Sequence, residues 1–124
     1  MENYLPCFAR LARVVARRAL PVRLSKYAYP AYRPSSLFAA LLVKEHFRLN
    51  YRGLEILLRI SEQLRRLFGF LSVPYHSTFW WFARRWLSAE LVSSALAETV
   101  RRVIHYFAVR NPPISRTSTL LSGI

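Results

Sequence analysis

The 124-residue sequence contains no aspartate, and its six acidic residues are all glutamates. Chemistry that depends on a cluster of aspartates around Mg²⁺ therefore cannot be carried out by this chain alone. There is a single cysteine, Cys7, which excludes an internal disulfide and fits a reducing compartment. The three glycines, Gly53, Gly69 and Gly123, are isolated from one another, so no glycine-rich phosphate loop is present.

Long apolar stretches are also missing. The longest uncharged run, residues 67–83, contains Gly69, Pro74 and His76, and is too short and too interrupted for a membrane-spanning helix. No segment has the pattern of a signal peptide. We therefore expect a cytoplasmic protein with no membrane partner.

What the sequence does contain is positive charge. The formal net charge is +13, from 17 arginines and 2 lysines against the six glutamates. Such a surplus favours a polyanionic partner, either nucleic acid or an anionic membrane surface. A GC-rich genome would explain the preference for arginine over lysine, but it would not explain the shortage of acids.

Apolar residues recur at helical spacing along most of the chain, and no segment has a convincing strand pattern. The prediction is an all-α fold: a compact cluster of about five short helices with a longer C-terminal helix, resembling a helix-turn-helix protein. The expected helices span Tyr4–Ala19, 37–47, Tyr51–Ile60, Glu62–Phe68, 78–87 and 89–109. Their expected N-caps include Ser35 or Ser36, Ser61, Ser77 and Ser88, and Gly69 is expected to end the fourth helix.

These helices suggest four parts. Residues 1–20 form an N-terminal amphipathic basic helix, on which Arg10, Arg13 and Arg17 make a stripe that is either solvated or contacts phosphate. Residues 21–35 form a linker rich in proline and tyrosine. Residues 36–110 form the main helical domain, and residues 111–124 a flexible tail.

The sequence offers little for catalysis. Cys7, His46, His76 and His105 show no spacing that links a nucleophile to a base, and no aspartate is available to orient a histidine. Zinc ligands at short spacing are missing as well. We expect no catalytic residues, no metal, no cofactor and no small-molecule substrate.

The strongest positive signal lies in the fifth helix. At 100° per residue, Phe79, Phe82, Ala83 and Trp86 share one face, which we expect to be buried. The opposite face carries short polar groups, an indole and two cations, namely Ser77, Thr78, Trp81, Arg84 and Arg85. Together with the first amide groups of the helix, this face could hold phosphate or reach a guanine edge. An ordinary solvated surface is the alternative.

Four short motifs occur in this order along the chain: Leu41-Leu42-Val43-Lys44-Glu45, Tyr51-Arg52-Gly53-Leu54, Leu67-Phe68-Gly69-Phe70 and Val73-Pro74-Tyr75-His76-Ser77-Thr78-Phe79. In order and spacing, residues from about 27 to 109 resemble the N-terminal helical domain of DDE-type insertion-sequence transposases. Two departures are Tyr75, where the family usually has aspartate, and Trp81, where a basic or polar residue is common.

This resemblance implies binding to the terminal inverted repeats of a mobile element, possible dimerisation and a prokaryotic, nucleoid-associated location. It also implies a ribonuclease-H-like catalytic domain after the helical domain, whose aspartates this sequence lacks. The chain therefore resembles a truncated transposase, or one half of a transposase whose catalytic half is encoded separately.

Three hypotheses follow. In the first, the chain is a non-catalytic DNA-binding domain that uses Ser77, Thr78, Trp81, Arg84 and Arg85, with Arg52 and the arginines of the first helix as electrostatic support. In the second, it is an inactive remnant whose aromatic side chains packed on a missing domain. In the third, it is a basic amphipathic protein of the membrane surface.

Overall fold

The computed structural model describes residues 4–20 and 32–110. It contains six α-helices and, within these ranges, no β-strand: α1 (Tyr4–Ala19), α2 (Pro34–His46), α3 (Tyr51–Ile60), α4 (Glu62–Phe68), α5 (His76–Trp86) and α6 (Ala89–Arg110). The all-α prediction is confirmed. Of the expected linker at 21–35, residues 21–31 lie outside the described residues, as does the expected tail at 111–124. The linker was predicted to extend too far, because residues 34 and 35 belong to α2.

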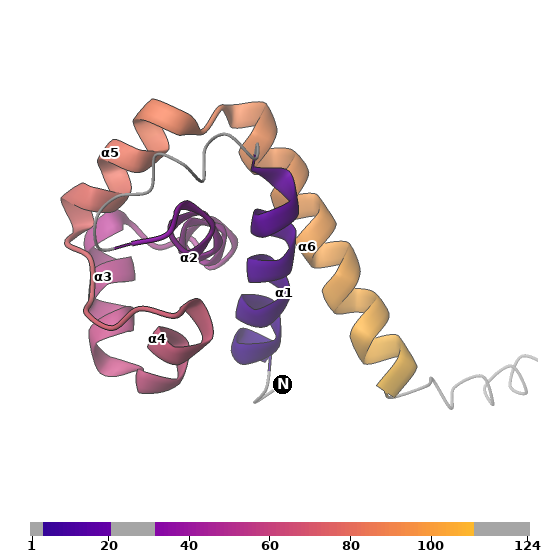
Figure 1. The fold of residues 1–124 in the computed structure, drawn as a ribbon. Helices are drawn as coiled ribbons and strands as arrows, with labels where there is room; N and C mark the ends of the chain where they lie inside the picture. The colour runs from indigo at the N-terminus through magenta and orange to yellow at the C-terminus, as the bar shows by residue number, and fades with distance from the viewer. Residues whose placement is uncertain (1–3, 21–31, 111–124) are drawn as a thin grey trace, which may run out of the picture.

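Helix α2 is the centre of the molecule, as its apolar sequence predicts. Seven consecutive residues, Leu37 to Val43, are buried, and α2 packs against each of the other five helices. Figure 1 shows α2 nearly end-on, with α1 and α6 on one side and α3, α4 and α5 on the other. A helix that is apolar on every face is stable only when it is enclosed in this way.

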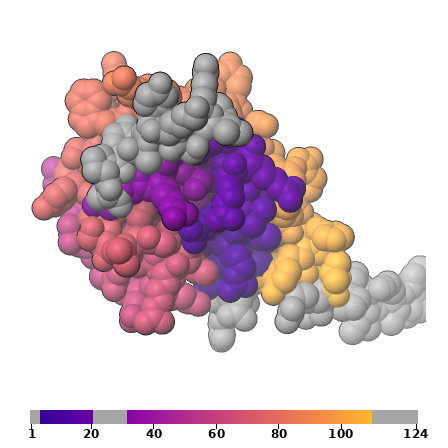
Figure 2. Space-filling view, viewed as in Figure 1, coloured from indigo at the N-terminus to yellow at the C-terminus, as the bar shows by residue number. Residues whose placement is uncertain are grey.

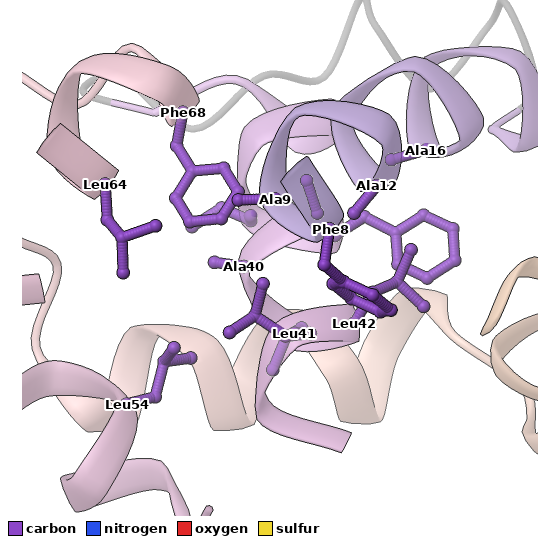
Figure 3. Close-up of a cluster of buried hydrophobic side chains, with 14 of the residues drawn as sticks. Phe8, Ala9, Ala12, Ala16, Ala40, Leu41, Leu42, Leu54, Leu64 and Phe68 are labelled. Carbon is purple, nitrogen blue, oxygen red and sulfur yellow. The ribbon is translucent and has the colours of Figure 1, made fainter. Parts of the chain in front are cut away.

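Small side chains let α1 approach α2 closely. Ala9, Ala12 and Ala16 of α1 and Ala40 of α2 are fully buried, and Figure 3 shows them between larger side chains such as Phe8 and Phe68. α1 also packs against α4 and α6. Residues that precede the segment 21–31 in the sequence and residues that follow it therefore pack in one core.

The predicted N-caps of α4 and α6 are confirmed, and the predicted N-cap of α2 is wrong. Ser61 and Ser88 accept hydrogen bonds from the backbone amides of Leu64 (3.2 Å) and Leu91 (3.0 Å), as an N-cap does. Ser35 and Ser36, however, lie inside α2, whose N-cap is Arg33 and whose first residue is Pro34. Proline has no amide hydrogen and a fixed φ, so it fits the first turn of a helix, and the helix begins three residues earlier than expected.

The helix ends are held by charged side chains from other helices. Arg65 of α4 donates from one Nη to the carbonyl oxygens of Leu58 (2.7 Å) and Arg59 (2.8 Å) at the end of α3. Arg13 of α1 donates to the carbonyl oxygen of Leu67 (2.7 Å) at the end of α4. These contacts satisfy carbonyl groups that a helix leaves without partners at its C-terminus.

Arg13 was expected to lie on a basic stripe with Arg10 and Arg17, and this is wrong. Arg10 and Arg17 are exposed, whereas Arg13 is half-buried against α4. Burial lowers the pKa of the Arg13 guanidinium, with Arg17 and Arg33 adding to the effect. The helical spacing was correct, but it could not reveal that α4 covers this part of the face.

Gly69 ends α4, as predicted, in the left-handed conformation (φ 78°). A Cβ atom at this position would lie 3.2 Å from an Nη atom of Arg13. Both the backbone conformation and the close guanidinium favour glycine here.

The connection between α4 and α5 spans residues 69–75. It is longer than the turn of three or four residues that is typical of a helix-turn-helix motif. α5 packs on α3 and α2. The expected resemblance to a helix-turn-helix protein therefore stays a prediction.

Candidate nucleic-acid interface

Glu55 of α3 fixes the beginning of α5. Its Oε1 atom accepts a hydrogen bond from the backbone amide of His76 (2.8 Å) and lies 3.0 Å from Nδ1 of the same residue. Its Oε2 atom accepts from Nε of Arg59 (3.0 Å). The His76 amide, followed by the side chains of His76 and Arg59, lowers the pKa of Glu55, against the opposing effect of burial. A carboxylate at this place also has a favourable interaction with the dipole of α5.

The sequence placed the N-cap of α5 at Ser77, and this is wrong. The N-cap is Tyr75, which makes no side-chain capping bond, and α5 begins at His76. The Ser77 hydroxyl was expected to accept a hydrogen bond from an amide in the first turn, and Glu55, 21 residues before His76 in the sequence, accepts one there instead. The expected end of the helix at residue 87 is also one residue too late.

This arrangement changes what the N-terminus of α5 can bind. The amide of His76 donates to Glu55, and the amide of Thr78 donates to the carbonyl oxygen of Tyr75 (2.9 Å). Phosphate was expected to use these first amides, but a carboxylate already occupies the first of them. Anion binding by α5 therefore depends more on its side chains than the sequence suggested.

The predicted division of α5 into two faces is confirmed. Phe79 and Phe82 are fully buried, and Ala83 and Trp86 are half-buried beside the core. The opposite side carries the expected set, with Thr78 half-buried and four residues exposed: Ser77, Trp81, Arg84 and Arg85.

Aromatic rings and guanidinium groups are paired on the exposed face of α5. The Arg84 guanidinium lies over the Trp80 ring, 5.2 Å from its centroid, and the Trp80 and Trp81 rings meet edge to face at 4.7 Å. Such contacts hold a guanidinium in place without neutralising its charge. Trp80, 39% exposed, was left out of the predicted site, although its spacing of four residues from Arg84 indicates this contact.

We refer to Trp80, Trp81, Arg84 and Arg85 as the α5 surface. Helix α5 has no acidic residue. Four of the glutamates form ion pairs elsewhere, with Lys44, Arg59, Arg66, Arg101 and Arg102 as partners. In the part of the chain that the structure describes, no ion pair involves Arg84 or Arg85. The α5 surface therefore keeps its full positive charge.

Arg52, the remaining predicted site residue, is exposed on α3. α3 packs directly against α5, and Figure 1 shows the two helices on the same side of the molecule. Its supporting role in DNA binding stays a prediction.

Within residues 4–20 and 32–110, no group of three or more His, Cys, Asp or Glu side chains is arranged to hold a metal ion. His76 is bound to Glu55. His46 stacks on Phe8, with ring centroids 4.2 Å apart, and lies 2.6 Å from the hydroxyl of Tyr4. These two histidines are thus placed in structural contacts.

A separate question is membrane insertion. None of the helices in the described ranges is both long enough and apolar enough to cross a bilayer.

Comparison with protein families gives a match over most of the helical cluster. Residues 8–85 match the family model described as Transposase domain (DUF772). The chain belongs to this family. Comparisons with curated proteins and with solved structures found no match.

The match to the transposase domain runs from α1 through Arg85 of α5, so it includes all four residues of the α5 surface and not α6. Two motifs that carried the sequence resemblance meet in space. The segment around Tyr51–Leu54 opens α3, and the segment 73–79 leads into α5. The contact between Glu55 and His76 joins them.

Proposed function

We propose that this transposase-family chain binds DNA through the α5 surface. The observation that carries the proposal is that two exposed guanidinium groups on one helix have no carboxylate partner among the described residues, while Arg84 lies over the exposed ring of Trp80 and Arg85 over the half-buried ring of Trp86. Arginine binds phosphate and guanine edges, and the indole offers a flat surface for sugar or an unpaired base. The net charge of +13 supplies long-range attraction.

The DNA in this proposal is the terminal inverted repeats of a mobile element, as the resemblance to insertion-sequence transposases implies. Ser77 and Thr78 contribute their hydroxyl groups, and Arg52 with Arg10 and Arg17 adds electrostatic attraction. The chain contributes binding rather than cutting. With no aspartate in the sequence, the catalytic carboxylates come from a segment or polypeptide other than this one.

The double variant Arg84→Ala/Arg85→Ala tests the site. Binding of a short fluorescein-labelled duplex is followed by anisotropy over a range of salt concentrations. If each arginine neutralises one phosphate, the slope of log K against log salt becomes shallower by about 2, and affinity at low salt falls.

The matched control is Arg66→Ala/Arg101→Ala. These arginines are exposed and ion-paired on α4 and α6, and their removal changes the net charge by the same amount. We expect a smaller loss than for the α5 pair, with helicity unchanged in both by circular dichroism. Equal losses in the two variants would contradict a DNA site on α5.

A second function has support from the same surface. Trp81 is 59% exposed, and large exposed aromatic residues often mark a protein interface. In that case α5 would pack on a separately encoded catalytic domain and would not contact DNA. Solution sizing separates the two: a monodisperse chain that binds duplex favours the DNA-binding domain, and polydisperse aggregates favour a surface that has lost its partner.

A further inference from the structure

A groove runs between α1 and α6, on a different side of α2 from α3 and α5. Two hollows of about 330 and 610 Å³ open between these helices, and they share Glu98, Arg101 and Arg102. Figures 1 and 2 show α1 and α6 lying side by side. On α6 the lining extends from Leu91 to Val109, which corresponds to roughly 27 Å of helix.

The lining combines apolar side chains with cations. Leu11 of α1 and Tyr106 and Val109 of α6 line the larger hollow, and Val109 is 62% exposed. Concave apolar surface of this length is what an amphipathic helix covers when it binds in a groove.

The charges of the groove are unbalanced. Arg18, Arg101 and Arg102 line the smaller hollow with a single carboxylate, Glu98. Glu98 pairs with Arg101 and, at 2.8 Å, with Nε of Arg102. After this pairing the groove still carries a surplus of two positive charges, because three guanidinium groups face one carboxylate. The complementary partner is therefore acidic.

We propose that the α1–α6 groove binds an acidic amphipathic helix of another protein, with apolar side chains against Leu11, Tyr106 and Val109 and carboxylates toward Arg18 and Arg101. A duplex fits less well, because Arg101 and Arg102 are already paired with Glu98 and the surface of the larger hollow is mostly apolar. This proposal does not depend on DNA binding by α5.

A second copy of the chain is a poor occupant. Each described helix carries at most two glutamates, so no helix presents an acidic face. Residues 111–124, the segment that follows α6, contain Arg116 and no acid. The positive groove is complementary to a helix rich in acidic residues, and this chain has no such helix among those described.

The probe is a fluorescein-labelled synthetic helix with leucines on one face and glutamates on the other. A peptide of the same composition in shuffled order tests whether amphipathicity matters, and a peptide with lysine in place of glutamate tests the charge. We expect the full chain to bind the first peptide and to bind the other two at least about tenfold more weakly.

Three variants locate the binding. Val109→Lys adds a positive charge but removes apolar surface, and Arg18→Glu/Arg101→Glu reverses the charge of the groove. Both should weaken peptide binding about tenfold, whereas Arg84→Ala/Arg85→Ala should leave it unchanged. Since Val109, Arg18 and Arg101 are exposed, folding should be preserved, and circular dichroism checks this.

Several outcomes would overturn the proposal. If Val109→Lys binds the peptide more tightly, or if the groove and α5 variants lose equal peptide affinity, the peptide is held by the overall positive charge of the chain and not by the groove. A loss of duplex affinity in Arg18→Glu/Arg101→Glu without a loss of peptide affinity would make the groove a nucleic-acid surface. A dimer that Val109→Lys dissociates would assign the groove to a second copy. None of these results bears on the α5 surface, which the duplex assay with Arg84→Ala/Arg85→Ala tests separately.

Discussion

Glu55 links two of the four segments that carry the resemblance to transposases, the start of α3 and the start of α5. Its carboxylate is only 15% exposed and receives hydrogen bonds from the His76 amide and from Arg59. Removing this carboxylate would leave the partly buried amide of His76 without an acceptor, and an unpaired buried donor costs more free energy than the hydrogen bond contributes. The orientation of α5, and with it the α5 surface, depends on this residue.

We expect Glu55→Ala to lower the free energy of unfolding by roughly 1–3 kcal/mol, and Glu55→Gln to lower it less, because the amide oxygen can still accept from His76. Urea denaturation measures both. Glu62→Gln is the control, because Glu62 pairs with Arg66 in an exposed i,i+4 contact and such pairs contribute little. Equal effects at positions 55 and 62 would contradict the role given to Glu55.

The titration of His46 makes the stability of the fold depend on pH. Burial lowers the pKa of its imidazole below the ordinary value of 6.5. The unfolded chain therefore binds a proton more readily than the folded chain, and stability that is present above pH 6.5 is lost as the pH falls through the folded pKa.

Glu55 acts in a lower window, because its pKa is lowered from 4.5; the stability it contributes is lost only below that value. We therefore expect the midpoint of urea denaturation to fall between pH 7 and 5 in the wild-type chain and to change much less in His46→Asn. A wild-type midpoint that is constant over this range would contradict the burial of His46.

At the scale of the helices, the sequence predicted most elements but only some of their ends. The bounds of α1, α3 and α4 were correct because hydrophobic spacing, Ser61 and Gly69 are local signals. The start of α2 was missed although its cause, Pro34, is local, whereas the start of α5 involves a distant residue. Ser77 was a good local candidate for an N-cap, but α5 begins one residue before it, and Glu55 of α3 accepts a hydrogen bond from the amide of His76, the first residue of the helix. Arg13 had the spacing of a surface residue, and only the packing of α4 shows otherwise.

Arg13 connects the end of α4 to α1 and lies against Gly69. We expect Arg13→Met, which keeps the length of the side chain, to lower the free energy of unfolding by about 1–3 kcal/mol because the Leu67 carbonyl loses a charged donor. Arg10→Met, at an exposed position of the same helix, should change it by less than about 0.5 kcal/mol. Thermal unfolding followed by circular dichroism compares them, and a larger effect at Arg10 would be inconsistent with the contact.

At the scale of the whole molecule, the candidate site was predictable in part. The spacing in α5 separated Phe79 and Phe82 from Trp81, Arg84 and Arg85, and the structure has the same division. The contact of Arg84 with Trp80 was missed, although the spacing of four residues in the sequence indicates it. The sequence could not indicate the α1–α6 groove, which brings together residues roughly 70 to 100 positions apart in the chain.

The central claim is that the exposed side of α5 touches DNA, and a photocrosslink tests it most directly. Trp81 is replaced by the photoreactive amino acid p-benzoylphenylalanine, and Ile104, 64% exposed on α6, is replaced in a second chain as the control. After irradiation with a labelled duplex at low salt, we expect crosslinked DNA from position 81 and little from position 104. Crosslinking that is equal at the two positions, or found only at position 104, would contradict the assignment of DNA binding to α5.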